Sequence, residues 1–155
     1  ITATNRSTVS SYKAQRVLFQ PYQYKPLLKV IDSPDRRLLI ADEVGLGKTI
    51  EAGLILTELE AWQAIDKVLI VCPSRLRDKW REELNRKFDQ DFEIYDKGAF
   101  NGYVTRLRDN PLRSRLRCIM SMQTMRNAEL REVVEAEVGA FDVVIFDEAH
   151  HSQNP

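Results

Sequence analysis

Residues 41–49 read ADEVGLGKT, a stretch that has the composition of a phosphate-binding loop. Gly45 and Gly47 permit backbone angles that other residues resist, so successive amides can point at phosphate oxygens. Lys48 would reach the β- and γ-phosphates of a nucleotide, and the hydroxyl of Thr49 would hold magnesium. The loop therefore predicts a nucleotide site.

The flanks of this loop favour the same interpretation. The apolar run 38–41 suits a buried strand, and the helix expected from Thr49 to Trp62 would point its positive end at the loop. The strict pattern G-x-x-x-x-G-K-[ST] fails at its first position, which is Asp42, although Asp tolerates left-handed angles better than most residues. The alternative is a surface turn that happens to contain Gly-Leu-Gly-Lys. The strand before it and the helix after it make that alternative the weaker one.

A second segment, residues 143–150, reads VVIFDEAH. It is an apolar strand that ends in two carboxylates, of which Asp147 is placed to hold hydrated magnesium and Glu148 to polarise an attacking water. The alternative is a pair of solvated acids at a strand end, which the phosphate loop in the same chain disfavours. His150 either links the nucleotide site to another lobe or is an ordinary loop histidine.

Apolar runs alternate with helical patterns along the chain. Strands are expected at Val68–Cys72, Phe92–Tyr95, Arg117–Met122 and Asp142–Phe146. Besides the helix after the loop, helical spacing follows Pro21 and recurs in Arg75–Phe88 and Asn127–Val138. This alternation indicates an α/β fold with a mainly parallel sheet covered on both faces. Ligands bind at the carboxyl edge of such sheets, where both motifs should lie.

The composition limits the remaining possibilities. A chain of 155 residues suits one domain, and 23 basic against 23 acidic residues give no net field to attract nucleic acid. Cys72 and Cys118 lie in apolar runs, which favours buried free thiols over a disulfide. No apolar run reaches the roughly 18 residues of a membrane span, and residues 1–16 lack a signal peptide's apolar stretch. We therefore expect a soluble cytoplasmic protein without a membrane partner.

Five segments carry a resemblance to a known family. Residues 42–53, DEVGLGKTIEAG, resemble motif I of the SWI/SNF-like ATPases of helicase superfamily two, closest to the bacterial branch with the RNA-polymerase-associated recycling ATPase. Asp in place of the first glycine is usual in that family. Residues 68–80 resemble motif Ia, 147–150 match motif II, and 118–123 correspond loosely to motif Ib. Residues 19–23, FQPYQ, resemble the segment with which the family reads adenine. The likeness spans roughly residues 19–151.

The resemblance implies a three-layer RecA-like P-loop NTPase lobe that uses ATP and Mg²⁺. It implies catalytic roles for Lys48 and Glu148, magnesium ligation by Thr49 and Asp147, and coupling to another lobe through His150. The nucleotide contacts that it implies are Gln23 at the adenine, together with Asp42, Glu43, Gly45, Leu46, Gly47, Lys48, Thr49 and Ile50. An amide such as that of Gln23 can both donate to and accept from an adenine edge.

The expected domain division is a polar lead-in over residues 1–18 and an ATP-binding lobe over residues 19–155. The lobe is expected to be incomplete, because the chain stops soon after motif II and lacks the second lobe that family members have. That second lobe supplies arginines worth about a thousandfold or more in turnover. The chain alone is therefore expected to be nearly inactive.

Nucleic-acid contacts are expected at Arg75 and Arg77 in motif Ia and at Ser121 and Gln123 in motif Ib, with a charged solvent face as the alternative. Trp80 is expected in the core rather than as a platform for base stacking. A denser basic run either contacts nucleic acid or, as the favoured interpretation, forms a solvated loop; it comprises Arg106, Arg108, Arg113, Arg115 and Arg117.

The intact enzyme is expected to couple nucleic-acid-dependent ATP hydrolysis to translocation along double-stranded DNA in a bacterial or archaeal cell, displacing or remodelling a nucleic-acid-bound protein. One alternative is a strand-separating superfamily-two helicase, although the DEAH-type RNA helicases usually carry a Thr-Gly-Ser-Gly-type loop. Another is a nucleotide-binding scaffold that never hydrolyses, against which intact Lys48 and Glu148 argue.

Overall fold

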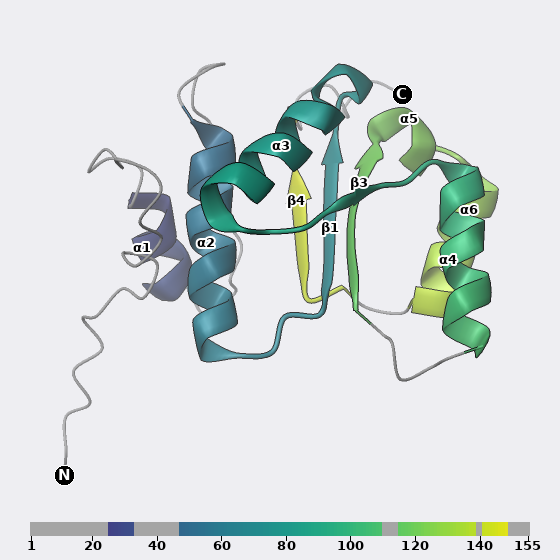
Figure 1. Cartoon of the computed structure of the whole chain (residues 1–155), viewed down its shortest axis with the longest axis horizontal. Coiled ribbons are helices and arrows are strands. Elements are labelled where there is room, and N and C mark those ends of the chain that lie inside the picture. Colours follow the sequence, from purple (N-terminus) through teal and green to yellow (C-terminus); the bar gives the residue numbers. More distant parts are fainter. Residues whose placement is uncertain (1–24, 33–46, 110–114, 139–140, 149–155) are drawn as a thin grey trace, which may run out of the picture.

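A parallel sheet forms the centre of the computed structural model, which describes residues 25–32, 47–109, 115–138 and 141–148 (Figure 1). In that part of the chain the strand order is β2-β3-β1-β4, and every pairing is parallel. The strands are β1 (Lys67–Cys72), β2 (Glu93–Ile94), β3 (Leu116–Ser121) and β4 (Val143–Phe146). Because all four run the same way, their carboxyl ends meet at one edge of the sheet.

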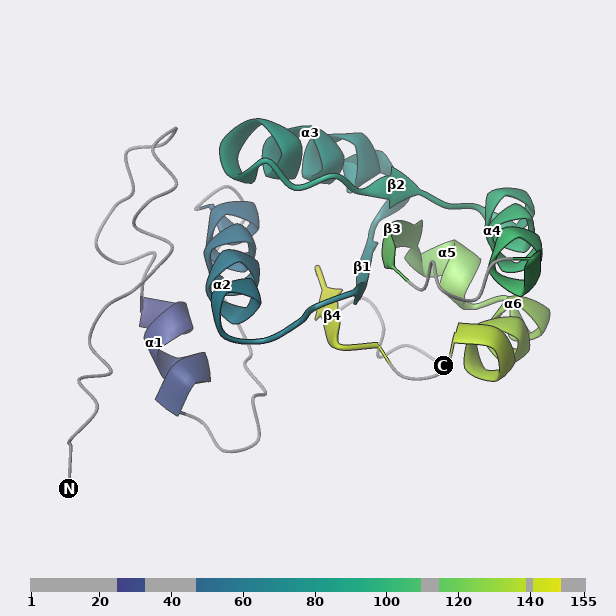
Figure 2. The ribbon, with the colours of Figure 1, turned by 60° about the horizontal axis from the view of Figure 1, so that its bottom comes forward.

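Helices cover both faces of this sheet, so the predicted three-layer α/β architecture is confirmed (Figure 2). α2 and α3 pack on one face and α4, α5 and α6 on the other, while α1 packs against α2. Their bounds are α1 (Lys25–Asp32), α2 (Lys48–Trp62), α3 (Arg77–Phe88), α4 (Lys97–Asp109), α5 (Met122–Met125) and α6 (Ala128–Val133). A 3₁₀ turn, η3 (Ser74–Leu76), precedes α3, and a π turn, η4 (Val134–Val138), follows α6.

Two separate apolar clusters hold these layers together, and β1 contributes to both. Its alternating residues Val68, Ile70 and Cys72 face α2 and α3, whereas Leu69 and Val71 face α4 and α6. A strand buried on both faces is typical of a parallel sheet. This explains the uninterrupted apolar run in the sequence.

α2 and α3 approach each other closely at Gly53. A Cβ atom there would lie 2.3 Å from the Phe88 ring, so only glycine fits without moving that ring. This contact fixes the two helices that flank the carboxyl edge of β1.

Several element boundaries differ from the sequence expectation. α3 begins at Arg77 because the chain after Pro73 first forms the 3₁₀ turn η3. The helix expected over Asn127–Val138 is divided between α6 and η4. β4 is not buried on both faces, since Val144 and Phe146 are exposed at the end of the described strand order. The strand expected at 38–41 lies outside the described residues.

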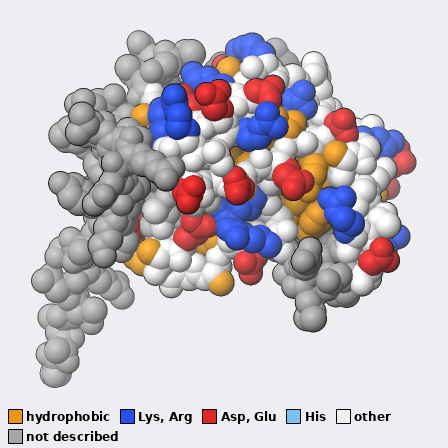
Figure 3. All heavy atoms as spheres, viewed as in Figure 1, with side chains coloured by type: hydrophobic (Ala, Val, Ile, Leu, Met, Phe, Trp, Pro, Cys, Tyr) orange, Lys and Arg blue, Asp and Glu red, His pale blue; other side chains and the backbone are white. Residues whose placement is uncertain are grey.

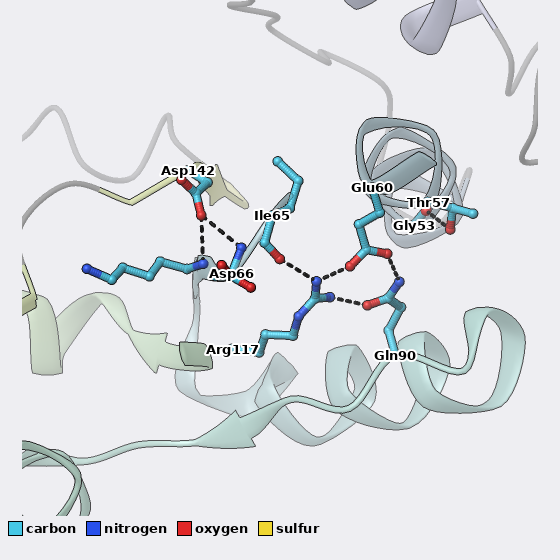
Figure 4. Close-up of polar contacts among 9 residues, drawn as sticks. Gly53, Thr57, Glu60, Ile65, Asp66, Gln90, Arg117 and Asp142 are labelled. Carbon is cyan, nitrogen blue, oxygen red and sulfur yellow. Dashed lines mark hydrogen bonds and ion pairs between the residues drawn. The ribbon is translucent and has the colours of Figure 1, made fainter. Parts of the chain in front are cut away.

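The interpretation of the basic run as a solvated loop holds at Arg115, which is exposed outside any helix or strand, but it is wrong for the other residues of the run that the structure describes. Arg106 and Arg108 lie on α4, and Arg117 lies on β3 with a buried side chain. Figure 4 shows the Arg117 guanidinium paired with Glu60 and Gln90, and it also donates to the Ile65 carbonyl at 3.0 Å. Because a buried guanidinium needs such partners, Arg117 joins β3 to α2 and is not available to nucleic acid.

The cysteines are free and buried, as predicted. Burial raises the pKa of the Cys72 thiol to about 12, and burial has the same effect on Cys118. Both groups therefore stay protonated at neutral pH. None of the helices in the described ranges is long and apolar enough to cross a bilayer.

Candidate nucleotide site

A cleft of about 190 Å³ opens at the carboxyl edge of the sheet. One wall is the start of α2, residues 47–50, and another is α3. Asp147 and Glu148, which directly follow β4, also line the cleft, together with α2 and α3. The cleft thus contains parts of both sequence motifs, as the topology of a parallel sheet requires.

The first turn of α2 presents its backbone amides to this cleft. Gly47 precedes the helix with φ 95° and ψ 29°, a left-handed conformation that favours glycine. Its carbonyl accepts hydrogen bonds from the amides of Ile50 and Glu51 at 2.8 and 3.1 Å. The amides of Lys48 and Thr49 belong to the first turn, where no intrahelical acceptor exists. Together with the helix dipole, this arrangement suits an anion.

Lys48 and Asp147 meet in the cleft. The Lys48 Nζ atom lies 3.5 Å from Asp147 Oδ1, and the Asp147 side chain is buried. The predicted convergence of the two motifs is therefore confirmed. The catalytic role of Lys48 and the magnesium role of Asp147 stay predictions.

Trp80 fixes the other oxygen of the same carboxylate. Its indole Nε1 donates to Asp147 Oδ2 at 2.9 Å, and the Asp147 amide donates to the Val71 carbonyl at 2.9 Å, which continues the ladder beyond β4. The expectation that Trp80 belongs to the core is confirmed. Its hydrogen bond to Asp147 was not foreseen, because an apolar helical spacing does not reveal where an indole N–H points.

Glu148 lies beside Asp147 with its side chain almost fully buried. Its backbone has φ 55°, a left-handed value that is uncommon outside glycine. Both carboxylate oxygens accept from Arg75 Nη2, at 3.1 and 3.3 Å. Glu148, the predicted catalytic residue, is thus paired with Arg75, which was predicted to contact nucleic acid.

The other predicted nucleic-acid contacts lie around the same edge. Arg77 Nε donates to the Ser74 carbonyl at 3.2 Å, and the Ser74 hydroxyl donates to Gln123 Oε1 at 3.0 Å. Ser121 is buried, and its hydroxyl caps α5 by accepting from the Thr124 amide at 2.9 Å. Outside the described residues lie Gln23, Asp42, Glu43, Gly45, Leu46 and His150.

The oxygen ligands of the cleft fit magnesium. Thr49 is buried beside Lys48 and supplies a hydroxyl, and Asp147 supplies a carboxylate. In the described part of the chain, no cluster of three His, Cys, Asp or Glu residues could hold a metal. Magnesium does not need such a cluster, because it binds through one or two carboxylates together with substrate phosphates and water.

The sheet, the helix after Gly47 and the carboxylates together define a P-loop nucleotide-binding lobe of the RecA-like type. The sheet is parallel and covered on both faces, the helix carries Lys48 and Thr49, and the pair of carboxylates lies across the cleft. Residues 16–155 match the family described as "Type III restriction enzyme, res subunit", and the chain belongs to this family. It is a superfamily-two ATPase domain of the SWI/SNF-like kind, which confirms the resemblance found in the sequence.

Two bacterial relatives are named RNA polymerase-associated protein RapA. The chain is 35% identical over 136 residues to that of Pasteurella multocida (strain Pm70), which covers 84% of this chain and 14% of the relative. It is 34% identical over 146 residues to that of Haemophilus influenzae (strain PittEE), with 94% and 16% covered. The chain thus matches about one seventh of the length of these relatives.

Proposed function

We propose that this chain is the ATP-binding lobe of an ATP-dependent translocase on double-stranded DNA, which displaces or remodels a nucleic-acid-bound protein in the bacterial or archaeal cytoplasm. The observation that carries the proposal is the 3.5 Å contact between Lys48 and Asp147, with Glu148 in the same cleft. The names of the relatives support a partner of this kind, because those proteins are described as RNA polymerase-associated.

Four residues of the cleft carry the phosphate and magnesium chemistry in this proposal. Lys48 and the amides of the first turn of α2 bind the phosphates, while Thr49 and Asp147 hold Mg²⁺. The metal, when bound, neutralises charge that develops on the phosphate oxygens. Glu148 orients the attacking water and accepts its proton. Burial of Asp147 and Glu148 keeps both carboxylates in fixed positions.

Residues outside the described ranges complete the proposed nucleotide site. Gln23 reads the adenine edge, and the loop residues Asp42, Glu43, Gly45 and Leu46 surround the phosphates with backbone amides. Ile50, which lines the cleft, adds an apolar contact. His150 couples the nucleotide site to a second lobe.

Arg75, Arg77 and Gln123 are proposed to contact the nucleic-acid backbone, and Ser121 supports them by capping α5.

Removing the indole N–H of Trp80 is expected to weaken magnesium-dependent ATP binding. Trp80→Phe keeps the buried ring but leaves Asp147 Oδ2 without the donor at 2.9 Å. Mutating a group that orients a metal ligand typically lowers metal affinity or activity by about 10- to 100-fold. We expect about a tenfold rise in the Mg²⁺ concentration needed for ATP binding, measured by titration. Trp62→Phe is the matched control, because Trp62 is exposed on α2. Equal Mg²⁺ dependence of the two variants would contradict the assignment.

The proposal is tested by measuring ATP hydrolysis by the full-length protein with and without double-stranded DNA. We expect hydrolysis that DNA stimulates, together with displacement of a triplex-forming strand and no unwinding of a duplex. Efficient duplex unwinding would favour the strand-separating helicase instead. ATP binding without hydrolysis under either condition would favour the scaffold.

A further inference from the structure

Arg75 connects the outer surface of the molecule to a buried carboxylate. Its side chain is 70% exposed, whereas that of Glu148 is 6% exposed, yet the two form an ion pair at 3.1 Å. Of the described residues, Leu76 and Lys79 line the cleft but Arg75 does not. The guanidinium therefore approaches Glu148 from outside the nucleotide cleft.

The contact engages the carboxylate that is proposed to act on water. Arg75 Nη2 donates to both oxygens of Glu148, at 3.1 and 3.3 Å. A general base needs an oxygen directed at the proton that it accepts, so an engaged carboxylate is less available for that step. Glu148 also holds φ 55°. Such a conformation is uncommon for a non-glycine residue, and residues of this kind cluster at active sites, ligand clamps and switch regions. Arg75 therefore contacts a residue of this kind.

The turn that carries Arg75 suits an external anion. Arg75 and Arg77 place two guanidinium groups within η3 and the first residue of α3. Ser74 links this turn to α5 through Gln123, so its backbone is anchored on both sides. The contact with Glu148 uses Nη2 alone among the donors of the Arg75 guanidinium. A phosphate binds a guanidinium in a bidentate manner and is therefore a strong competitor for it.

We propose that Arg75 is a positioning residue that holds Glu148 out of action until a backbone phosphate of nucleic acid binds at η3 and draws the guanidinium away. Phosphate binding outside the cleft then releases Glu148 from its contact with Arg75. The inference rests on the proposed function, and it assigns to one side chain the coupling between nucleic-acid binding and ATP hydrolysis.

The test compares the full-length protein with its Arg75→Ala variant, using double-stranded DNA as the probe. We expect ATP hydrolysis without DNA to rise about fivefold or more, in the usual range of coupling between two sites. The rate at saturating DNA and the KM for ATP should stay within about twofold of the wild type. Because only the rate without DNA rises, the ratio of the rate with DNA to the rate without it falls. Arg75→Lys keeps the charge but loses the planar fork, and it should give an intermediate rate without DNA.

Arg86→Ala is the matched control, because Arg86 is an exposed arginine in the last turn of the same helix, α3. It removes the same charge and should leave the rate without DNA unchanged. An unchanged thermal unfolding midpoint of Arg75→Ala verifies that the variant folds, as the exposure of Arg75 leads us to expect.

Two results separate this inference from the proposed function. If the wild type is stimulated by DNA but Arg75→Ala lowers both rates by the same factor, or changes neither, the inference is overturned and the proposed function stands. If the wild type does not hydrolyse ATP, the proposed function fails and the inference fails with it.

Discussion

Glu148→Gln is expected to lower the kcat of ATP hydrolysis by about a thousandfold while ATP still binds. The amide keeps the size of the side chain and can still accept from Arg75, but it cannot take a proton from water. Loss of a general base typically costs about 10²- to 10⁴-fold in rate. Steady-state hydrolysis by the full-length protein at saturating DNA measures the loss, and a fluorescent ATP analogue measures binding.

Glu132→Gln is the control for this change, because Glu132 is exposed on α6, on the opposite face of the sheet. It should leave hydrolysis unchanged. A Glu148→Gln variant with near wild-type turnover would show that another group activates the water, and the assignment of Glu148 would be wrong.

Lys48→Ala is expected to weaken ATP binding and to reduce turnover by about a hundredfold or more, the usual cost of removing one preorganised donor that stabilises charge in a transition state. The substitution also leaves the buried Asp147 carboxylate without the ammonium at 3.5 Å, so both sides of the cleft are affected. ATP affinity and turnover, measured on the same preparation, give the two effects separately.

Lys97→Ala is the control for Lys48, because Lys97 pairs with Glu129 on the surface formed by α4 and α6. It removes one positive charge far from the cleft, so it should leave both measurements unchanged. If Lys48→Ala kept wild-type affinity and turnover, the phosphates would have to bind elsewhere.

Most of the fold followed from the spacing of apolar residues. β1 and β3 are buried on both faces, and each was predicted to within one residue because an apolar run between polar segments marks both ends. α4 was not predicted. Its glycines and aromatic residues have low helix propensity, and only its packing of Phe100, Tyr103 and Val104 under the sheet makes it a helix.

Charged surface patterns were less informative than apolar ones. Figure 3 shows acidic and basic side chains interspersed on one face of the molecule, in accord with the balanced charge of the sequence. Arg117 belonged by sequence to a basic run, yet it is buried, because Glu60 and Gln90 come to it from distant parts of the chain. Such partners are brought together only by the tertiary fold.

The candidate site was predictable where a motif restricts the backbone, and not where contacts form between motifs. The glycine before α2 and the carboxylates after β4 follow from local sequence, and the parallel sheet brings them together. The contacts of Trp80 with Asp147 and of Arg75 with Glu148 join residues 67 and 73 positions apart. No local pattern specifies these pairs.

The central claim is that Lys48 and Asp147 serve one magnesium nucleotide. A structure of the full-length protein with Mg²⁺ and a non-hydrolysable ATP analogue tests it most directly. We predict that the Lys48 ammonium contacts the terminal phosphates and that the Asp147 carboxylate lies on the metal or on its bound water. A nucleotide bound away from the cleft between α2 and β4 would contradict the account.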